Sequence, residues 1–332
     1  MILVTGAAGY LGSHAMVTLH DAGRRVIGVD NHSSSRPEVM TALERRVGTP
    51  PNIVRMDLRD TGRLREFLTA QNVKAVLHFA GFKSVEASVT DPLGYYDNNV
   101  GSTISLLQAM RGAGVRQLIF SSSCTVYGDA DDVPIDESAP LRPVSPYGET
   151  KAAIETLLIR LVEAEPDWSI TALRYFNPIG ADASGLIGED PSMAPTTLLP
   201  NILAVAIGDK NRLRVFGGDH PTPDGSCQRD FVHVTDLIEG HITALDRLPF
   251  GAGFDAINLG TGVPTSVFEM VAACRVATGS EIPIEVVDRR PGDASVTYAT
   301  VDRARDELGW NPRRSVEEMV TDHWRFHSAH RW

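Results

Sequence analysis

Tyr147 and Lys151 are the residues of this sequence whose types and spacing point most directly to chemistry. Four residues apart on a helix, they would share one face, with about 5–6 Å between them. An ammonium at that distance favours the phenolate and lowers the pKa of a tyrosine from its usual value of about 10. A phenolate of this kind is a general base toward a sugar or alcohol hydroxyl. Ser123, at the end of an apolar run, would orient the reacting oxygen.

A Tyr-Lys pair at this spacing also occurs on ordinary helix surfaces, so the interpretation depends on the start of the chain. There a short apolar strand leads into Gly6, Gly9 and Gly12, followed by a helical pattern. The glycines allow a tight turn, and they offer the N-terminus of the helix to a pyrophosphate. Their first gap is one residue longer than in the common G-x-G-x-x-G fingerprint, so the match is to a variant. Asp30 ends the second strand, where a carboxylate accepts from an adenosine ribose and repels a 2′-phosphate; this favours NAD over NADP.

Short runs rich in β-branched residues alternate with helical patterns through the first half of the chain. The predicted strands are Ile2–Thr5, Val26–Asp30, Ile53–Asp57, Ala75–Ala80, Leu118–Ser122 and Ile170–Leu173. The predicted helices are Leu64–Gln71, Ser102–Ala113 and Tyr147–Glu163. This alternation indicates an α/β fold with a doubly wound parallel (Rossmann) sheet, whose ligands bind at the carboxyl ends of the strands. Gly6, Asp30, Asp57, Ala80 and Ser123 all fall at those ends.

The second half of the chain differs in composition and pattern, with irregular segments rich in proline and glycine. A chain of 332 residues is past the size at which one core usually suffices. We therefore expect a cofactor-binding domain at residues 1–175 and a smaller C-terminal α/β substrate lobe at 176–332. A helix at Asp236–Leu248 and a strand at Ala256–Leu259 predict that residues 236–260 return to the first domain.

Composition and charge argue against several classes of function. The net charge of −11 disfavours a nucleic-acid partner, which would need a basic stripe, although local arginines can still bind an anionic ligand. Three widely spaced cysteines form neither a disulfide framework nor a zinc pattern. His233 lacks a second ligand at suitable spacing, so we expect no metal. No run reaches the roughly 20 apolar residues of a membrane span, and no signal peptide is visible, so we expect a cytoplasmic protein without a membrane partner.

Further sequence strings, in the same order, resemble the extended short-chain dehydrogenase/reductase family, and within it the enzymes that invert C4 of a UDP-hexose. The resemblance covers essentially all 332 residues. Beyond the glycine triplet it rests on Asp30-Asn31, Met56–Leu58, His78–Lys83, Tyr95–Val100, Ser121–Gly128, Ser145–Lys151, Arg174–Pro178, Gly188–Pro191, Arg229–Asp236 and Arg290–Asp293.

The resemblance implies NAD-dependent 4-epimerisation, the interconversion of UDP-glucose and UDP-galactose through a 4-keto sugar. Tyr147 would take the proton of the 4-hydroxyl while C4 gives hydride to NAD. Lys151 would hold the nicotinamide ribose, and Ser123 would hydrogen-bond O4. The 4-keto sugar would then turn about its diphosphate linkage, and the hydride would return to its other face. The resemblance also implies a homodimer, formed through segments at about 95–113 and 147–163.

The site residues that the resemblance implies fall into two sets. Contacts to NAD are expected from Gly6, Gly9, Tyr10, Leu11, Gly12, Asp30, Asn31, Asp57, Leu58, Phe79, Ala80, Gly81, Lys83, Asn98, Ser121, Tyr147, Lys151 and Tyr175. Contacts to substrate are expected from Lys83, Ser123, Tyr147, Phe176, Asn177, Thr197, Leu198, Phe216, Arg229, Arg290, Asp293 and Thr297. Arg229 and Arg290 are candidates for the diphosphate, because a guanidinium fork matches phosphate oxygens in pairs. Asp293 would bind the uridine ribose, and Phe216 would pack on uracil.

The chain departs from the family at two positions of the expected sugar pocket. Thr297 stands where a bulky tyrosine is common, and Thr197 where an asparagine usually contacts the hexose. A larger pocket with added hydroxyls keeps two related substrates open, UDP-N-acetylglucosamine and UDP-glucuronate. A 4,6-dehydratase or uronate decarboxylase is disfavoured, since Cys124 and Thr125 stand where a dehydratase typically carries an acid pair. A non-catalytic NAD-binding regulatory protein is a remote alternative, because such a protein would commonly lack the tyrosine or the lysine, and this chain has both.

Overall fold

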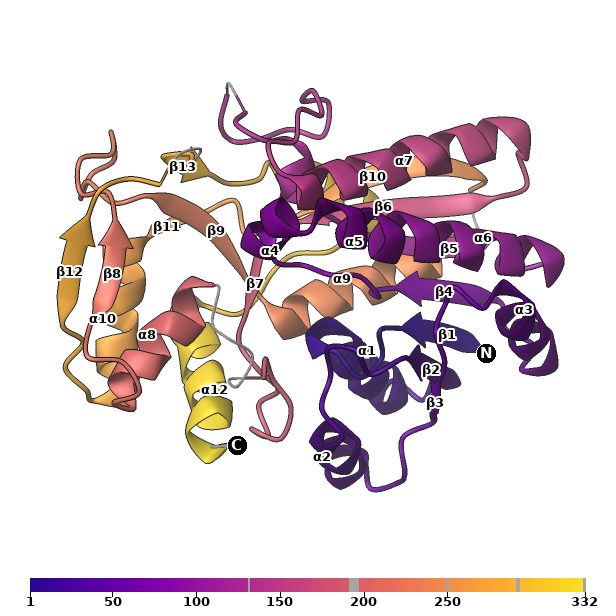
Figure 1. Ribbon diagram of the computed structural model, residues 1–332, viewed down its shortest axis with the longest axis horizontal. Helices are drawn as coiled ribbons and strands as arrows, with labels where there is room; N and C mark the ends of the chain where they lie inside the picture. Colours follow the sequence, from indigo (N-terminus) through magenta and orange to yellow (C-terminus); the bar gives the residue numbers. More distant parts are fainter. Residues whose placement is uncertain (131, 191–196, 249–250, 291–292, 331–332) are drawn as a thin grey trace.

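The computed structural model describes residues 1–332 apart from residues 131, 191–196, 249–250, 291–292 and 331–332. Its centre is a sheet of seven parallel strands in the order β10-β6-β5-β4-β1-β2-β3 (Figure 1). The strands are β1 (Ile2–Thr5), β2 (Val26–Asp30), β3 (Ile53–Arg55), β4 (Ala75–His78), β5 (Gln117–Ser123), β6 (Ser169–Tyr175) and β10 (Gly253–Leu259). The strand order changes direction between β1 and β4, which in this fold places the ligand crevice beyond the carboxyl ends of the strands. The predicted doubly wound parallel sheet is confirmed.

Helices lie on both faces of this sheet and around its edge. They are α1 (Tyr10–Asp21), α2 (Glu38–Val47), α3 (Thr61–Ala70), α4 (Val85–Thr90), α5 (Pro92–Tyr95), the π-helix η1 (Tyr96–Gly101), α6 (Ser102–Gly112), the 3₁₀ turn η2 (Cys124–Val126), α7 (Pro146–Ala164), α9 (Val234–Arg247) and α11 (Asp302–Leu308). Side chains of β1 alternate between two cores, as the period of a strand requires. Ile2 and Val4 pack toward α1, α9 and α11, whereas Leu3 packs toward α3, α6 and α7. Burial on both faces explains why these strands read as nearly continuous apolar runs.

The second lobe, at the left of Figure 1, is built from shorter elements. Its strands are β7 (Asn177–Ile179), β8 (Leu213–Phe216), β9 (Gln228–His233), β11 (Pro264–Ser266), β12 (Ile284–Val287) and β13 (Val296–Thr297). Its helices are α8 (Leu198–Ala206), α10 (Val267–Thr278) and α12 (Val316–Ala329). β9 pairs with β7, β11 and β13, and β8 pairs with β12. Apolar side chains of the three helices and of β8 and β9 form one core here.

Two findings bear on the predicted domain boundaries, which stay a prediction. β10 lies beside β6 at the edge of the central sheet, where the expected return of residues 236–260 would place it. The expected assignment of all of residues 261–332 to the second lobe is too broad. Ala304, Leu308 and Trp310 belong to the core between α1, α9 and the central sheet, because the apolar side of α11 packs on α9 and β10.

Candidate functional site

Ser123 and Tyr147 meet at the carboxyl end of the central sheet. Ser123 is the last residue of β5, and Tyr147 lies in the first turn of α7. The helix begins there because the Ser145 side chain accepts from the backbone N–H of Gly148 at 3.2 Å and Pro146 occupies the first turn. Both side chains are buried, and the Ser123 hydroxyl lies near enough to the phenol to lower the pKa of Tyr147. The structure therefore brings together two of the three predicted catalytic groups.

Lys151, the third group, is fixed to the strand rather than to the phenol. Its Nζ donates to the backbone carbonyl of Ser121 at 2.8 Å and lies 5.9 Å from the ring centroid of Tyr147. It also lies 4.9 Å from the ring centroid of Phe120. Burial lowers the pKa of Lys151 to about 8, and the charge of Glu155 opposes this shift.

The expected lowering of the tyrosine pKa is wrong for this structure. Burial raises the pKa of Tyr147 above its usual value of 10, and the nearby Ser123 hydroxyl only partly offsets this effect. The shared face of Tyr147 and Lys151 is as predicted, but the ammonium is directed to the Ser121 carbonyl. Removal of the phenol from water outweighs attraction to a cation at this distance.

The glycine-rich turn has the shape of a diphosphate cradle. Gly6 has a φ of +66°, and a Cβ on it would meet the backbone nitrogen of Ala80 at 2.8 Å. A Cβ on Gly12 would lie 2.0 Å from the Gly6 carbonyl oxygen. α1 starts after Gly9, which has no side chain to cap the N–H groups of the first turn. These groups are donors for an anion at the N-terminus of the helix, so the turn fits the diphosphate of a dinucleotide.

The acids that end the next two strands have separate roles. The Asp30 carboxylate accepts from the backbone N–H groups of Ala8 at 3.0 Å and His32 at 2.7 Å, which ties β2 to the glycine-rich turn. Asp57, after β3, accepts from the Asn31 side chain at 3.1 Å. Hydrogen bonds from Arg59 hold the pKa of Asp57 well below its usual range. These groups fit the ribose and adenine end of a dinucleotide.

The remaining predicted cofactor residues also follow strands of the same sheet edge or flank them. Leu58 follows β3, and Asn98 lies in η1. Ser121 and Tyr175 lie near the ends of β5 and β6. The residues that follow β4 are Phe79, Ala80, Gly81 and Lys83. Tyr10 and Leu11 open α1. The Tyr10 hydroxyl donates to the Gly180 carbonyl at 2.7 Å. Lys83 pairs with Glu189 at 2.5 Å, which connects the loop after β4 to the segment that follows β7.

Four of the predicted substrate residues gather in two pairs in the second lobe. Arg229, on β9, lies 3.5 Å from the Asp293 carboxylate and stands opposite Thr297 in the register of β9 and β13. The Arg290 guanidinium carbon lies 3.7 Å from the ring centroid of Phe216. The expected places of Arg290 at the diphosphate and Phe216 at uracil stay predictions. In this structure the two side chains stack on each other.

The other predicted substrate residues are spread along the junction of the lobes. Asn177 begins β7, and the Phe176 side chain before it is buried with Val126 and Tyr127. Thr197 is the exposed residue before α8 and makes no side-chain capping bond, and Leu198 opens the helix. The motif positions Pro191, Pro291 and Gly292, and residues 194–196 before Thr197, lie outside the described residues.

Sequence reasoning missed several buried polar groups behind the site. Glu155 and Arg174 form an ion pair at 2.6 Å, with side-chain exposures of 0% and 6%. Asn99 accepts from the Phe82 N–H at 2.8 Å and donates to the Phe82 carbonyl at 3.1 Å, which holds the loop after β4. The signal for Glu155 was its spacing, one helical turn after Lys151 on a face that is otherwise apolar.

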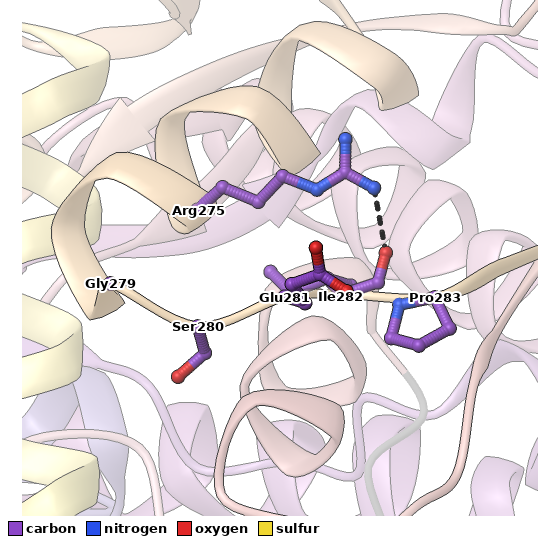
Figure 2. Close-up of a pocket in the computed structure, with 6 residues that line it drawn as sticks. All are labelled: Arg275, Gly279, Ser280, Glu281, Ile282 and Pro283. Carbon is purple, nitrogen blue, oxygen red and sulfur yellow. Dashed lines mark hydrogen bonds between the residues drawn. The ribbon is translucent and has the colours of Figure 1, made fainter.

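Figure 2 shows an open hollow at the C-terminal end of α10. It is lined by Arg275 and residues 279–283, and Arg275 donates to the Ile282 carbonyl at 2.7 Å. None of these residues is among the predicted site residues, and we assign the hollow no role. Among the described residues there is no group of three or more side chains that could hold a metal ion. Nor does any helix within the described residues have the length and apolar character of a membrane span.

Comparison with known proteins shows the family to which this chain belongs. The model of the NAD dependent epimerase/dehydratase family matches residues 2–260. The UDP-glucose 4-epimerase of Bacillus subtilis (strain 168) is 45% identical, with 99% of this chain and 97% of the relative covered. That of Yersinia enterocolitica is 46% identical, with 98% and 96% covered. The protein belongs to the NAD-dependent epimerase/dehydratase family.

The solved structures that superpose on this chain include UDP-glucose 4-epimerases. A UDP-glucose 4-epimerase from Stenotrophomonas maltophila, crystallised with bound NAD and formylated UDP-arabinopyranose, superposes with a TM-score of 0.96 at 44% identity, covering 99% of this chain and 98% of that one. The Bifidobacterium longum enzyme, in complex with NAD+ and UDP, gives 0.93 at 40% identity, covering 99% and 98%. The UDP-Glc/GlcNAc 4-epimerase of Campylobacter jejuni gives 0.86 at 31% identity, covering 99% of each chain.

Proposed function

We propose that this protein is an NAD-dependent UDP-hexose 4-epimerase that interconverts UDP-glucose and UDP-galactose. The observation that carries the proposal is the junction of Ser123, Tyr147 and Lys151 at the same sheet edge as the glycine-rich turn. At this edge Tyr147 would contact a hydroxyl of the substrate, and the carbon that carries this hydroxyl would face the dinucleotide. The names of relatives that match over nearly the whole chain support the same reaction.

In the proposed reaction Tyr147 removes the proton of the sugar 4-hydroxyl. Thr125 donates its N–H and its hydroxyl to Ser123 Oγ, at 3.2 and 3.0 Å. The Ser123 hydroxyl proton is therefore left for an acceptor, and we assign it to O4 of the sugar. Proton removal strengthens this bond, because an ionised acceptor forms the shorter and stronger hydrogen bond.

Ionisation of Tyr147 needs positive charge near it, because burial raises the pKa of the phenol. Lys151 supplies one such charge from a fixed position on the Ser121 carbonyl. Bound at this edge, NAD would accept and return the hydride of C4 and would add the positive charge of its nicotinamide. Lys151 would also hold the nicotinamide ribose, and the residues already named at the ends of β1 to β6 would hold the rest of the cofactor.

The second lobe would hold the nucleotide. Arg229 lies on a strand and Arg290 on a loop, so two guanidinium groups are available to the diphosphate, with Asp293 next to Arg229 for the uridine ribose. An epimerase needs this anchor to be tight and the hexose to be loosely held, since the 4-keto sugar must turn over between the two hydride transfers. We therefore expect few strong hydrogen bonds between the protein and the hexose.

The test is the product formed from UDP-galactose by the purified protein without added cofactor. We expect UDP-glucose, with no net formation of reduced nucleotide, and turnover lower by about 10²–10⁴-fold in Tyr147→Phe. A strict need for added NADPH, or reduced cofactor accumulating with product, would identify a conventional dehydrogenase. A dehydrated 4-keto-6-deoxy sugar would identify a dehydratase.

A second candidate substrate, UDP-N-acetylglucosamine, is favoured by the small side chains at Thr297 and Thr197. Thr297 lies beside Arg229 in the paired strands, so it borders the proposed diphosphate site. A threonine at a position where a tyrosine is common leaves room for a substituent at C2. UDP-glucuronate ranks behind it, because no additional basic residue marks the place of a carboxylate.

We also propose a homodimer formed through α6 and α7 and the segment before α6. Ile104 on α6 and Ile159 on α7 expose 40% and 37% of their surface, and Tyr96 in η1 exposes 40%. A two-fold contact between copies is the commonest way to cover such a face. Light scattering at micromolar concentration is expected to give the mass of two chains, and Ile104→Arg should reduce it to one.

A further inference from the structure

Three residues on one face of α7 contact three consecutive residues of β5. Tyr147 faces Ser123, whose hydroxyl lowers the pKa of the phenol, and Lys151 donates to the Ser121 carbonyl at 2.8 Å. One turn further along, Glu155 accepts from the Ser122 hydroxyl at 2.5 Å. Two of these α7 residues are the proposed catalytic groups, and the third, Glu155, has no part in the reaction as described.

Glu155 is a buried carboxylate whose oxygens are fully engaged. Arg174 on β6 donates to it through Nη2 at 2.6 Å and through Nε at 3.1 and 3.2 Å. Arg174 continues to the Tyr127 hydroxyl at 3.0 Å and the Glu137 carbonyl at 3.0 Å. Glu155 therefore connects α7 with both β5 and β6, two of the strands that end at the active site.

We propose that Glu155 is a positioning residue of the reaction, which fixes Lys151 over the end of β5 and supplies the negative charge that balances its ammonium. The inference rests on the proposed function and deepens it. It concerns a group that touches neither sugar nor cofactor and acts through Lys151.

Among the charged groups around Lys151, Glu155 is the one that can balance its ammonium. The titratable groups that face the ammonium are His78 on β4 and Tyr147 and Glu155 on α7, and beyond Glu155 lie Arg174 and Tyr127. Burial and the charge of Lys151 lower the pKa of His78 to about 3, so this imidazole is neutral at working pH. Glu155 is the group whose charge raises the pKa of Lys151 against the effect of burial.

A purely structural role is the alternative, because a buried ion pair is costly to break whatever it does for catalysis. The test must therefore follow Lys151 itself. The chain has four lysines, Lys74, Lys83, Lys151 and Lys210. The titration of each is resolved by NMR of the protein labelled with ¹³C at the lysine Cε, and Lys151 is assigned with Lys151→Met.

Glu155→Gln removes the charge and keeps the shape. We expect the Lys151 titration to move down by about one pH unit or more, the scale of a single lost charge in a buried site. The alkaline limb of the kcat profile should move down with it, because Lys151 then loses its proton at lower pH. Ser122→Ala, which removes a hydrogen bond to Glu155 but no charge, is the control and should leave the titration in place.

Glu155→Asp is measured alongside, since Glu155→Gln leaves Arg174 buried without its partner. Withdrawing the carboxylate by one methylene should give a smaller shift in the same direction. An unchanged Lys151 titration and alkaline limb in whichever of the two variants folds would overturn the proposal, even if unfolding temperature falls. Failure of the proposed function is a separate outcome, visible as absence of epimerisation by the wild-type protein, whereas the NMR titration needs no activity.

Discussion

The catalytic end and the nucleotide end of this protein are built in different ways. Tyr147 and Lys151 expose 5% of their surface each and are held by residues of one buried strand. On the nucleotide side, the Arg229 and Asp293 side chains expose 21% and 29% and lie 3.5 Å apart. A single, partly exposed ion pair at this distance is a weak constraint, so the second set is free to rearrange around a ligand. The chemistry is preorganised, and the anchor for the substrate is adaptable.

This difference suits a reaction in which the sugar must turn over between two hydride transfers. The reacting groups keep one geometry for both faces of the sugar, because a shift of about 1 Å in such a group can cost about 10²-fold in rate. The diphosphate anchor must hold while the hexose rotates. Changes at the catalytic end should therefore lower kcat, and changes at the nucleotide end should mainly raise KM.

The largest effect is expected at Tyr147. Tyr147→Phe removes the proposed general base from a buried site, and kcat should fall by about 10²–10⁴-fold. Binding of UDP, measured by calorimetry, should stay within about twofold, because the proposed nucleotide anchor consists of Arg229, Arg290 and Asp293 and does not include the phenol. Near wild-type turnover by this variant would refute the assignment of the base.

A change at the nucleotide end should separate binding from chemistry. Arg290→Ala removes a charged donor of the proposed diphosphate site, so KM for UDP-galactose should rise about 10- to 100-fold, with kcat changed little. Arg289→Ala is the matched control: Arg289 pairs with the exposed Asp219 at 2.7 Å, and KM should change by less than about twofold. Equal effects of the two variants, or a loss confined to kcat, would contradict the proposed division of labour.

Substrate preference should respond to Thr297. Thr297→Tyr fills the expected space for a C2 substituent and should shift the ratio of kcat/KM toward UDP-glucose over UDP-N-acetylglucosamine by about 10-fold or more. Thr297→Val, which keeps the volume and removes the hydroxyl, distinguishes lost space from a lost hydrogen bond. If the wild type prefers UDP-glucose and Thr297→Tyr leaves the ratio of kcat/KM values unchanged, the proposal of an enlarged sugar pocket is wrong.

The preorganised end should also make folding stability sensitive to acid. Burial lowers the pKa of His78 to about 3 and of His241 to about 4, below the value of about 6.5 of an exposed imidazole. The unfolded chain therefore binds more protons, and the free energy of unfolding should fall as pH drops from about 6.5 toward 4. Each histidine contributes up to about 1.4 kcal/mol per pH unit. His241→Gln should reduce that slope in denaturant titrations, and equal slopes in variant and wild type would contradict the assignment.

The same contrast explains how far the sequence alone could go. The predicted strands Ile2–Thr5 and Val26–Asp30 match β1 and β2, because strands buried on both faces give a strong apolar signal. The helix predicted at Tyr147–Glu163 differs from α7 by one residue at each end. In the second lobe, two- to four-residue strands such as β13 and β8 are too short to give a period.

The chemistry of the site was harder to predict than its location. Helical spacing placed Tyr147 and Lys151 on one face, but it said nothing of the direction of the ammonium, which the Ser121 carbonyl decides. The pKa of Tyr147 follows burial, a tertiary property that spacing does not contain. Glu155 and Arg174 lie on different elements, 19 residues apart, and only the packing of α7 against β6 makes them a pair.

The most direct test of the central claim, that hydride leaves C4 and returns to the same sugar, is isotope retention. UDP-galactose carrying deuterium at C4 is converted by the purified protein in ordinary water without added cofactor, and the product is analysed by mass spectrometry and NMR. We expect UDP-glucose that retains the deuterium at C4, with inverted configuration. Product with solvent hydrogen at C4, or deuterium accumulating in released reduced cofactor, would contradict it.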